Sequence, residues 1–196
     1  SILDTDLYKF TTSYAYMKLF PQATGTFTFT DRDNTEYPDE FIQQMYLELS
    51  NLGMHRLTKE EKDYMNSHCR FIPAMYWEWL SSFRFNSGKV SVFLDDKRHL
   101  HIQVTDYLYK ATLYEVPILA IVSELCNRML GNVANMDEVL TKLENKVRLS
   151  NVVGLPFSEF GTRRRFSSNV QEEVIAYIKD KSIYCTGTSN CYYAMK

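Results

Sequence analysis

Three consecutive arginines, at positions 163–165, are the residues of this sequence best suited to bind an anion. They follow a short apolar run, residues 157–160, and the glycine at position 161. Adjacent guanidinium groups repel one another, and a helix that begins just after them adds the partial positive charge of its N-terminus. We therefore expect an anion at this loop. The alternative is that the arginines pair on a solvated surface with nearby carboxylates, those of Glu159, Glu172 and Glu173.

A second polar stretch, Gly187-Thr188-Ser189-Asn190, offers backbone amides and two hydroxyl groups as hydrogen-bond donors. By itself it is typical of an ordinary turn with a helix cap. If the two stretches follow neighbouring parallel strands, they lie side by side at the C-terminal edge of the sheet. Together they then form an anion pocket, with Phe160 as an aromatic wall.

The elements around these two loops alternate between strand and helix. Residues 157–160 are expected to form a short buried strand, and Ser168 with Gln171 the capping box of the following helix. A second strand is expected at 183–186, with a helix starting after the second loop. Strand, loop and helix in this order are typical of a parallel α/β sheet.

The first part of the chain mixes helices with antiparallel strands. Residues 4–6 supply cap candidates for a first helix, and its apolar face is expected to carry Leu7, Phe10, Tyr14 and Met17. Alternating apolar residues predict a strand at 24–30, followed by a polar loop at 31–35. A hairpin is expected from strands at 90–94 and 100–104.

Helices are expected at 38–52, after a Thr58–Glu61 capping box, and at 75–83. Trp77 and Trp79 in the last of these are expected to pack in the core or at an interface. A longer apolar helix is expected at 118–130, and Asn135 is expected to cap the next one.

His99 and His101 share one face of the predicted hairpin. Two candidate ligands without a third nearby are weak evidence for zinc, because structural zinc sites use four. Solvent-facing positions on a half-buried sheet explain these histidines better. We therefore predict no metal bound by protein side chains.

Composition excludes several classes of protein. The chain has 196 residues, 45% of them hydrophobic, which is enough for a folded core. A net charge of −2 argues against general nucleic-acid binding, and no apolar run reaches membrane-spanning length. Four cysteines without C-x-x-C spacing indicate a reducing cytoplasm. Both ends look cut, so we expect a piece of a longer chain.

Four motifs together resemble the nicotinate phosphoribosyltransferase family. They occur in the family's order and with similar spacing, and the resemblance covers essentially all of this chain but only the N-terminal part of the family's longer polypeptide. The motifs are Asp4-Thr5-Asp6-Leu7-Tyr8-Lys9, Glu115-Val116-Pro117-Ile118-Leu119, Phe160-Gly161-Thr162-Arg163-Arg164-Arg165-Phe166 and Gly187-Thr188-Ser189-Asn190.

The resemblance implies a fold and an activity. The fold is α/β: an N-terminal α+β domain, residues 1–112, followed by the first βα units of an irregular, TIM-like barrel, residues 113–196, in the type II phosphoribosyltransferase architecture. The activity is the joining of nicotinate to phosphoribosyl pyrophosphate in NAD salvage, giving nicotinate mononucleotide and pyrophosphate, with coupled ATP hydrolysis and Mg²⁺. Alternatives are a nicotinamide or quinolinate phosphoribosyltransferase, or a non-catalytic module that binds an anionic partner through its arginines.

The resemblance also implies roles for individual residues. Arg163 is expected to hold the pyridine substrate's polar group, with Thr188 and Ser189 beside it. Ser189 falls where the related nicotinamide enzyme carries an aspartate, which favours nicotinate because serine does not repel a carboxylate. Phe160 and a Tyr8 that enters from the neighbouring subunit of a homodimer are expected to stack on the pyridine ring.

Other parts of the family's site are expected elsewhere. Arg164 and Arg165 are candidates for either phosphate contacts or structural pairing. The family's phosphorylated histidine is expected beyond Lys196, so the role passes to none of this chain's histidines, which are His55, His68, His99 and His101. This stretch is therefore expected to carry the pyridine side of a cytoplasmic enzyme's site and to be inactive by itself.

Overall fold

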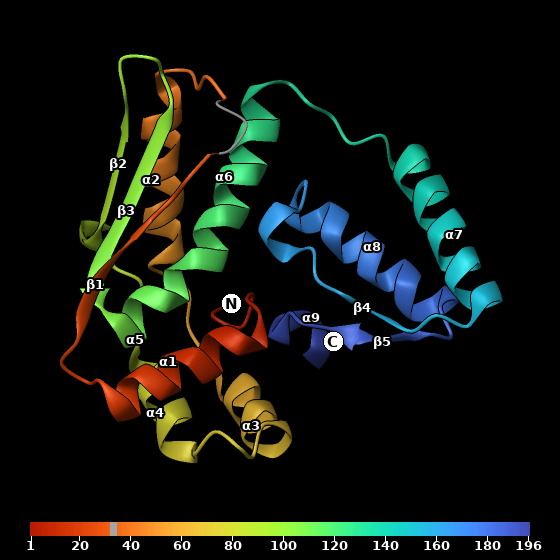
Figure 1. Cartoon of the computed structure of the whole chain (residues 1–196), viewed down its shortest axis with the longest axis horizontal. Helices are drawn as coiled ribbons and strands as arrows, with labels where there is room; N and C mark the ends of the chain where they lie inside the picture. Colours follow the sequence, from red (N-terminus) through yellow and green to blue (C-terminus); the bar gives the residue numbers. More distant parts are fainter. Residues whose placement is uncertain (32–34) are drawn as a thin grey trace.

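The computed structural model describes residues 1–31 and 35–196, which form two groups of elements (Figure 1). Arg32, Asp33 and Asn34, in the polar loop expected after the first strand, lie outside the described residues. No helix within the described residues is long and apolar enough to span a membrane.

An antiparallel sheet organises the first group. Its strands are β1 (Thr24–Thr28), β2 (Val90–Leu94) and β3 (Leu100–Tyr107), with β3 between the other two. Phe27 lies opposite Val104, and Val92 opposite Ile102. Residues on β2 and β3 alternate between buried and more exposed positions, so the sheet buries one face against helices. The predicted strand and hairpin are confirmed.

Helices cover the buried face of this sheet and extend beyond it. They are α1 (Leu7–Leu19), α2 (Glu40–Leu52), α3 (Lys59–His68), α4 (Ala74–Ser82), η1 (Ser87–Lys89), α5 (Leu108–Ala111), η2 (Thr112–Tyr114) and α6 (Glu115–Met129). The predicted capping box is present, since Thr58 accepts from the Glu61 amide and Glu61 from the Thr58 amide. The predicted core position of Trp77 is confirmed by its complete burial.

The buried face of α1 is more polar than its sequence suggests. Phe10 is completely buried as expected, but Lys9 and Ser13 are buried with it. Ser13 donates a hydrogen bond to the carbonyl of Tyr109 at 2.6 Å, and Lys9 forms an ion pair with Glu115. Polar residues can be buried when they are paired in this way, and apolar periodicity does not detect them.

Helix α6 begins at Glu115, three residues before the expected start. Pro117 therefore lies inside the helix, where the first turn tolerates it because amides there lack an intrahelical acceptor. The next helix is α7 (Met136–Val153), and the Asn135 side chain caps it as predicted by accepting from the Glu138 amide.

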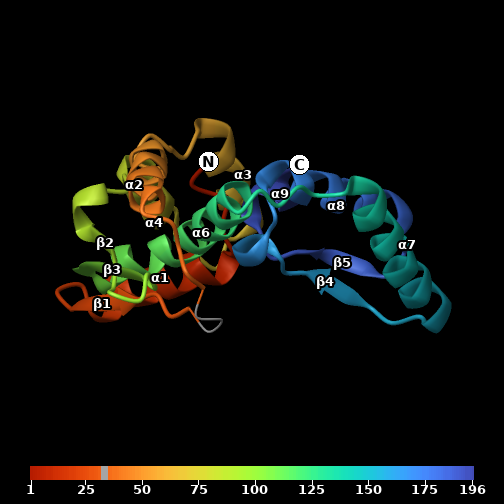
Figure 2. The same ribbon diagram turned by 90° about the horizontal axis from the view of Figure 1, so that it is seen from above.

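The second group contains a parallel strand pair, as predicted. β4 (Phe157–Glu159) pairs with β5 (Cys185–Thr188), and the elements after them are η3 (Thr162–Arg164), α8 (Ser168–Lys181) and α9 (Cys191–Met195). β5 both starts and ends two residues later than expected, so Gly187 and Thr188 belong to the strand. Figure 2 shows this pair below α8 and beside α7, on the opposite side of the molecule from the antiparallel sheet.

Two local predictions for this group are wrong. The cap of α8 is Ser167, which accepts from the Val170 amide, while Gln171 instead donates to Glu159. The strand is also not buried, because all three residues of β4 are at least partly exposed and Phe160, which follows it, is 49% exposed.

The N-terminal segment joins the two groups. Backbone amides of Cys191 and Tyr192 donate to the carbonyls of Thr5 and Leu3, and the Leu7 amide donates to the carbonyl of Ser189. Figure 1 accordingly shows α1 beside α9. The first motif of the chain thus lies against the last one.

Asn190 holds this junction together. Its side chain is completely buried, and its Nδ2 donates to Asp4 at 2.8 Å and to Thr162 at 2.9 Å. Its Oδ1 accepts from the amides of Tyr192 and Tyr193 and so caps α9. One side chain therefore forms hydrogen bonds with the N-terminal segment, with the loop after β4 and with the first amides of α9.

We expect Asn190→Ala to destabilise the full-length protein by about 2–4 kcal/mol, since it removes a helix cap and leaves buried partners without their hydrogen bonds. Asn135→Ala is the matched control, because it removes an exposed cap and should lower the free energy of unfolding by about 1 kcal/mol. Urea titration measures both. Equal losses would show that the buried hydrogen bonds of Asn190 add nothing to stability.

Candidate functional site

The arginine loop, residues 161–167, lies against carboxylates from distant parts of the chain. Arg163 Nη1 lies 3.1 Å from Glu115 Oε1 and Arg163 Nε 3.9 Å from Asp6 Oδ2. The Arg163 side chain is 33% exposed, so it is accessible while two acidic residues hold it. The predicted anion partner of this arginine is thus supplied in part by the protein itself.

Glu115 is the centre of these contacts. Besides Arg163, it pairs with the buried Lys9 and lies 3.4 Å from the hydroxyl of Tyr8. The first turn of α1, the start of α6 and the arginine loop therefore meet at one carboxylate. A charged acceptor shared by a lysine and an arginine fixes both cations, because hydrogen bonds between ions are stronger than neutral ones.

Two exposed aromatic rings border this cluster. The Arg163 guanidinium lies 5.2 Å from the centroid of the Phe160 ring, and Lys9 Nζ lies 4.8 Å from that of Tyr8. Tyr8 is 38% exposed. Tyr8 reaches the arginine loop of its own chain through Glu115, so no second subunit is needed to bring it there. The exchange of Tyr8 between subunits stays a prediction.

Ser189 and Asp6 form the next contact along the site. Ser189 Oγ donates to Asp6 Oδ1 at 2.6 Å, and Asp6 is 1% exposed. Burial raises the pKa of the Asp6 carboxyl above its ordinary value, although the Ser189 hydrogen bond and the Arg163 charge act in the opposite direction. Asp6 stands at the N-cap position of α1, but its side chain makes no capping hydrogen bond.

The Thr188 hydroxyl is hydrogen-bonded within the protein, although Thr188 also lines a pocket between β5, α8 and α9. Its hydroxyl donates to Glu159 Oε2 at 2.6 Å, and Gln171 donates to the other oxygen of that carboxylate at 2.8 Å. Glu159 therefore joins the ends of β4 and β5 to α8. It does not pair with the arginines, and Glu172 pairs with Lys196 at 2.6 Å. The surface pairing considered from sequence thus named the wrong carboxylates for the arginines.

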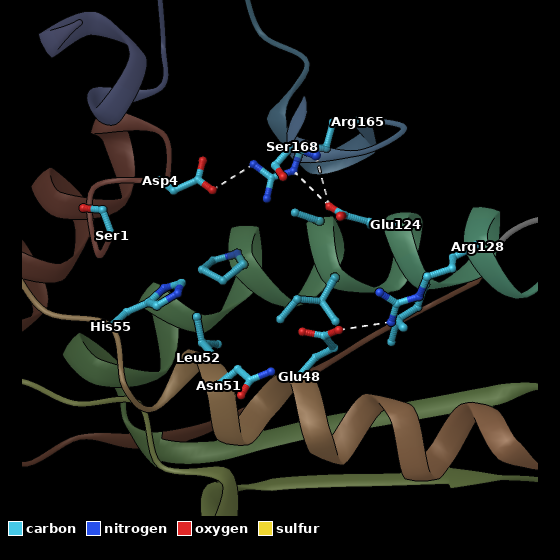
Figure 3. A pocket seen from close by; sticks show the side chains of 14 residues that line it. Ser1, Asp4, Glu48, Asn51, Leu52, His55, Glu124, Arg128, Arg165 and Ser168 are labelled. Carbon is cyan, nitrogen blue, oxygen red and sulfur yellow. Dashed lines mark hydrogen bonds and ion pairs between the residues drawn. The ribbon is translucent and has the colours of Figure 1, made fainter. Parts of the chain in front are cut away.

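Arg165 points to another side of the loop, into a cavity of about 200 Å³ between α2, α6 and the N-terminal segment (Figure 3). Its Nη1 lies 2.8 Å from Asp4 Oδ2, its Nε lies 3.8 Å from Glu124 Oε2, and its side chain is 10% exposed. Of the two roles considered for Arg165, the geometry supports structural pairing. Arg164 is exposed.

The four histidines lie away from Arg163 and its partners. His55 lines the Arg165 cavity, and His68 stacks on Tyr64. His99 Nδ1 and His101 Nε2 lie 3.3 Å and 3.2 Å from the same oxygen of Asp95. Within residues 1–31 and 35–196, no three His, Cys, Asp or Glu side chains are grouped to hold a metal ion.

The structure therefore brings together Tyr8, Phe160, Arg163 and Ser189 around two acidic residues. Neither Asp6, considered only as a cap candidate, nor Glu115 was assigned a role in the site from the sequence, although both stand in the motifs that carry the resemblance. Periodicity could not find them, because their partners are more than 40 residues away. The only signal in the sequence was their place in the motifs, where Asp6 stands two residues before Tyr8 and Glu115 two residues before Pro117.

Comparisons with known proteins identify the family of this chain. The model of the nicotinate phosphoribosyltransferase N-terminal domain matches residues 3–123, and that of the nicotinate phosphoribosyltransferase family matches residues 155–196. Among curated proteins, nicotinate phosphoribosyltransferases of Methanosarcina acetivorans and Neisseria meningitidis are 32% and 36% identical. Each match covers 100% of this chain and 52% of the relative, so the chain spans about half the length of the curated relatives it matches.

Solved structures give the same result. A nicotinate phosphoribosyltransferase from Porphyromonas gingivalis matches with a TM-score of 0.96 and 40% identity, over 100% of this chain and 50% of that one. A putative nicotinate phosphoribosyltransferase from Saccharomyces cerevisiae matches with a TM-score of 0.89 and 28% identity, over 99% and 51%. The fold predicted from the resemblance, an N-terminal α+β domain and the start of a type II phosphoribosyltransferase barrel, is confirmed. The chain belongs to the nicotinate phosphoribosyltransferase family.

Proposed function

We propose that the protein containing this chain joins nicotinate to phosphoribosyl pyrophosphate, forming nicotinate mononucleotide and pyrophosphate in NAD salvage. Family membership supports the reaction. The observation that carries the substrate is the partly exposed Arg163, held beside the exposed ring of Phe160. A cation next to an aromatic face suits a flat ring that carries a carboxylate.

The residues of this chain bind and orient the pyridine substrate. The guanidinium of Arg163 donates hydrogen bonds to the nicotinate carboxylate, and Glu115 keeps that guanidinium in place. The rings of Phe160 and Tyr8 offer faces for the pyridine ring, since aromatic rings prefer offset or edge-to-face contacts. Thr188 lies beside Ser189 at the end of β5, and its hydrogen bond to Glu159 supports this site.

The other features of the activity belong to the same proposal. ATP hydrolysis with Mg²⁺, a phosphorylated histidine and the ribosyl phosphate site are assigned to residues outside this chain. The described side chains do not group to fit a resident metal ion, so no step here passes through one. The homodimer and the domain boundary between residues 112 and 113 rest on the resemblance. The four cysteines are free thiols, which supports a cytoplasmic location.

We expect Arg163→Ala to weaken nicotinate binding by the full-length enzyme by about 10- to 100-fold, because a charge-assisted hydrogen bond to the substrate is lost. Isothermal titration calorimetry measures this loss directly. Arg148→Ala on the exposed side of α7 is the control for the loss of a positive charge. If Arg163→Ala binds nicotinate as tightly as the Arg148 variant, Arg163 does not contact the carboxylate.

We expect Ser189→Asp to lower the affinity for nicotinate at least about tenfold more than that for nicotinamide, because the new carboxylate faces the ligand's negative charge. Binding constants for both ligands, measured with wild type and variant, give the ratio. An unchanged ratio would show that residue 189 does not face that group.

A further inference from the structure

Asp6 is a buried carboxylate for which the proposed binding of nicotinate gives no role. It is 1% exposed, and its Oδ1 lies 2.6 Å from Ser189 Oγ. Its position at the start of α1 would suit a helix cap, but the side chain makes no capping hydrogen bond. Its main hydrogen-bonding partner is thus a residue of the proposed substrate site.

The Ser189 hydroxyl has one hydrogen to donate. While Asp6 is ionised it can only accept, so the hydrogen of Ser189 points to Asp6. The oxygen lone pairs of Ser189 are then left for a ligand. Lone pairs accept a hydrogen bond from an amide NH₂ but repel a carboxylate. In this state the pair favours nicotinamide, contrary to what Ser189 by itself suggests.

The charges around the site are already balanced. Two cations, Lys9 and Arg163, contact two anions, Asp6 and Glu115. A bound nicotinate therefore adds a negative charge without a matching positive one. An uncompensated charge next to buried carboxylates is unfavourable, because the surroundings screen it less than water does.

We propose that Asp6 takes up one proton when nicotinate binds, and that the Ser189 hydroxyl then turns its hydrogen from Asp6 to the nicotinate carboxylate. The proton comes from solvent and stays on an Asp6 oxygen, which donates to Ser189 Oγ. No covalent bond between heavier atoms forms or breaks. This inference rests on the proposed function, and it makes Asp6 the residue that sets the choice between nicotinate and nicotinamide.

The surroundings of Asp6 are consistent with this proton uptake. Burial is the main influence that raises the pKa of Asp6, and the nearby charge of Glu159 raises it further, while Ser189, Arg163 and Lys9 lower it. A substrate carboxylate acts in the same direction as Glu159. The titratable or charged side chains around Asp6 are Lys9, Tyr8, Glu115, Glu159, Arg163 and Cys191.

Calorimetric titration of the full-length enzyme in buffers of different ionisation enthalpy counts the protons taken up per ligand. Near neutral pH we expect about one proton per nicotinate and none per nicotinamide, and a nicotinate affinity that falls about tenfold per pH unit as pH rises. The affinity falls with rising pH because nicotinate binding requires a proton, and protons become scarcer as the pH rises. The wild-type measurement needs no variant to fold.

Asp6→Asn provides the matched variant. An asparagine amide donates to Ser189 Oγ as a protonated aspartate does, so nicotinate should bind without proton uptake and with little pH dependence. Glu78→Gln is the control, because it removes an exposed carboxylate on α4 that pairs with Lys62. This variant should keep the proton uptake.

Two outcomes would overturn the inference and leave the proposed function standing. Nicotinate binding without proton uptake in the wild type excludes protonation of Asp6. Uptake that persists in Asp6→Asn places the proton on another group. Failure of the wild-type enzyme to bind nicotinate at all would instead overturn the proposed function, and the inference with it.

Discussion

The positive charge of the arginine loop is the constraint on which the rest of the site depends. Three adjacent guanidinium groups need nearby negative charge, and the chain supplies it from both of its groups of elements. Glu115 and Asp6 hold Arg163, while Asp4 and Glu124 hold Arg165. The N-terminal segment and α6 are thereby fixed against the loop, and the junction between the two parts of the chain is where we propose the substrate site.

Much of the fold could be predicted because its signals are local. The capping box at Thr58, the cap at Asn135 and the hairpin with its alternating residues each depend on a few neighbouring positions, and the structure confirms them. The parallel pairing of β4 with β5 also followed from the order of apolar runs and loops. The sequence also predicted a charged loop at Arg163 beside an aromatic wall. The contact between the Arg163 guanidinium and the Phe160 ring agrees with this prediction.

The failures share a physical cause, which is competition for polar groups over long distances. Ser168 with Gln171 matched a capping box, but Gln171 donates to Glu159 on β4 and Ser167 takes the cap. The carboxylate partners of the arginines were sought nearby in sequence and lie on the N-terminal segment and α6. The exposure of Phe160 likewise depends on which elements cover β4, and the strand's own pattern does not contain that information.

The central claim is that one chain builds the pyridine site by holding Arg163 with its own carboxylates. A crystal structure of the full-length protein with nicotinate bound tests it most directly. The account predicts the nicotinate carboxylate on Arg163, the ring against Phe160, and Glu115 still paired with Arg163. Nicotinate bound away from Arg163, or at an Arg163 whose contact with Glu115 is broken, would contradict it.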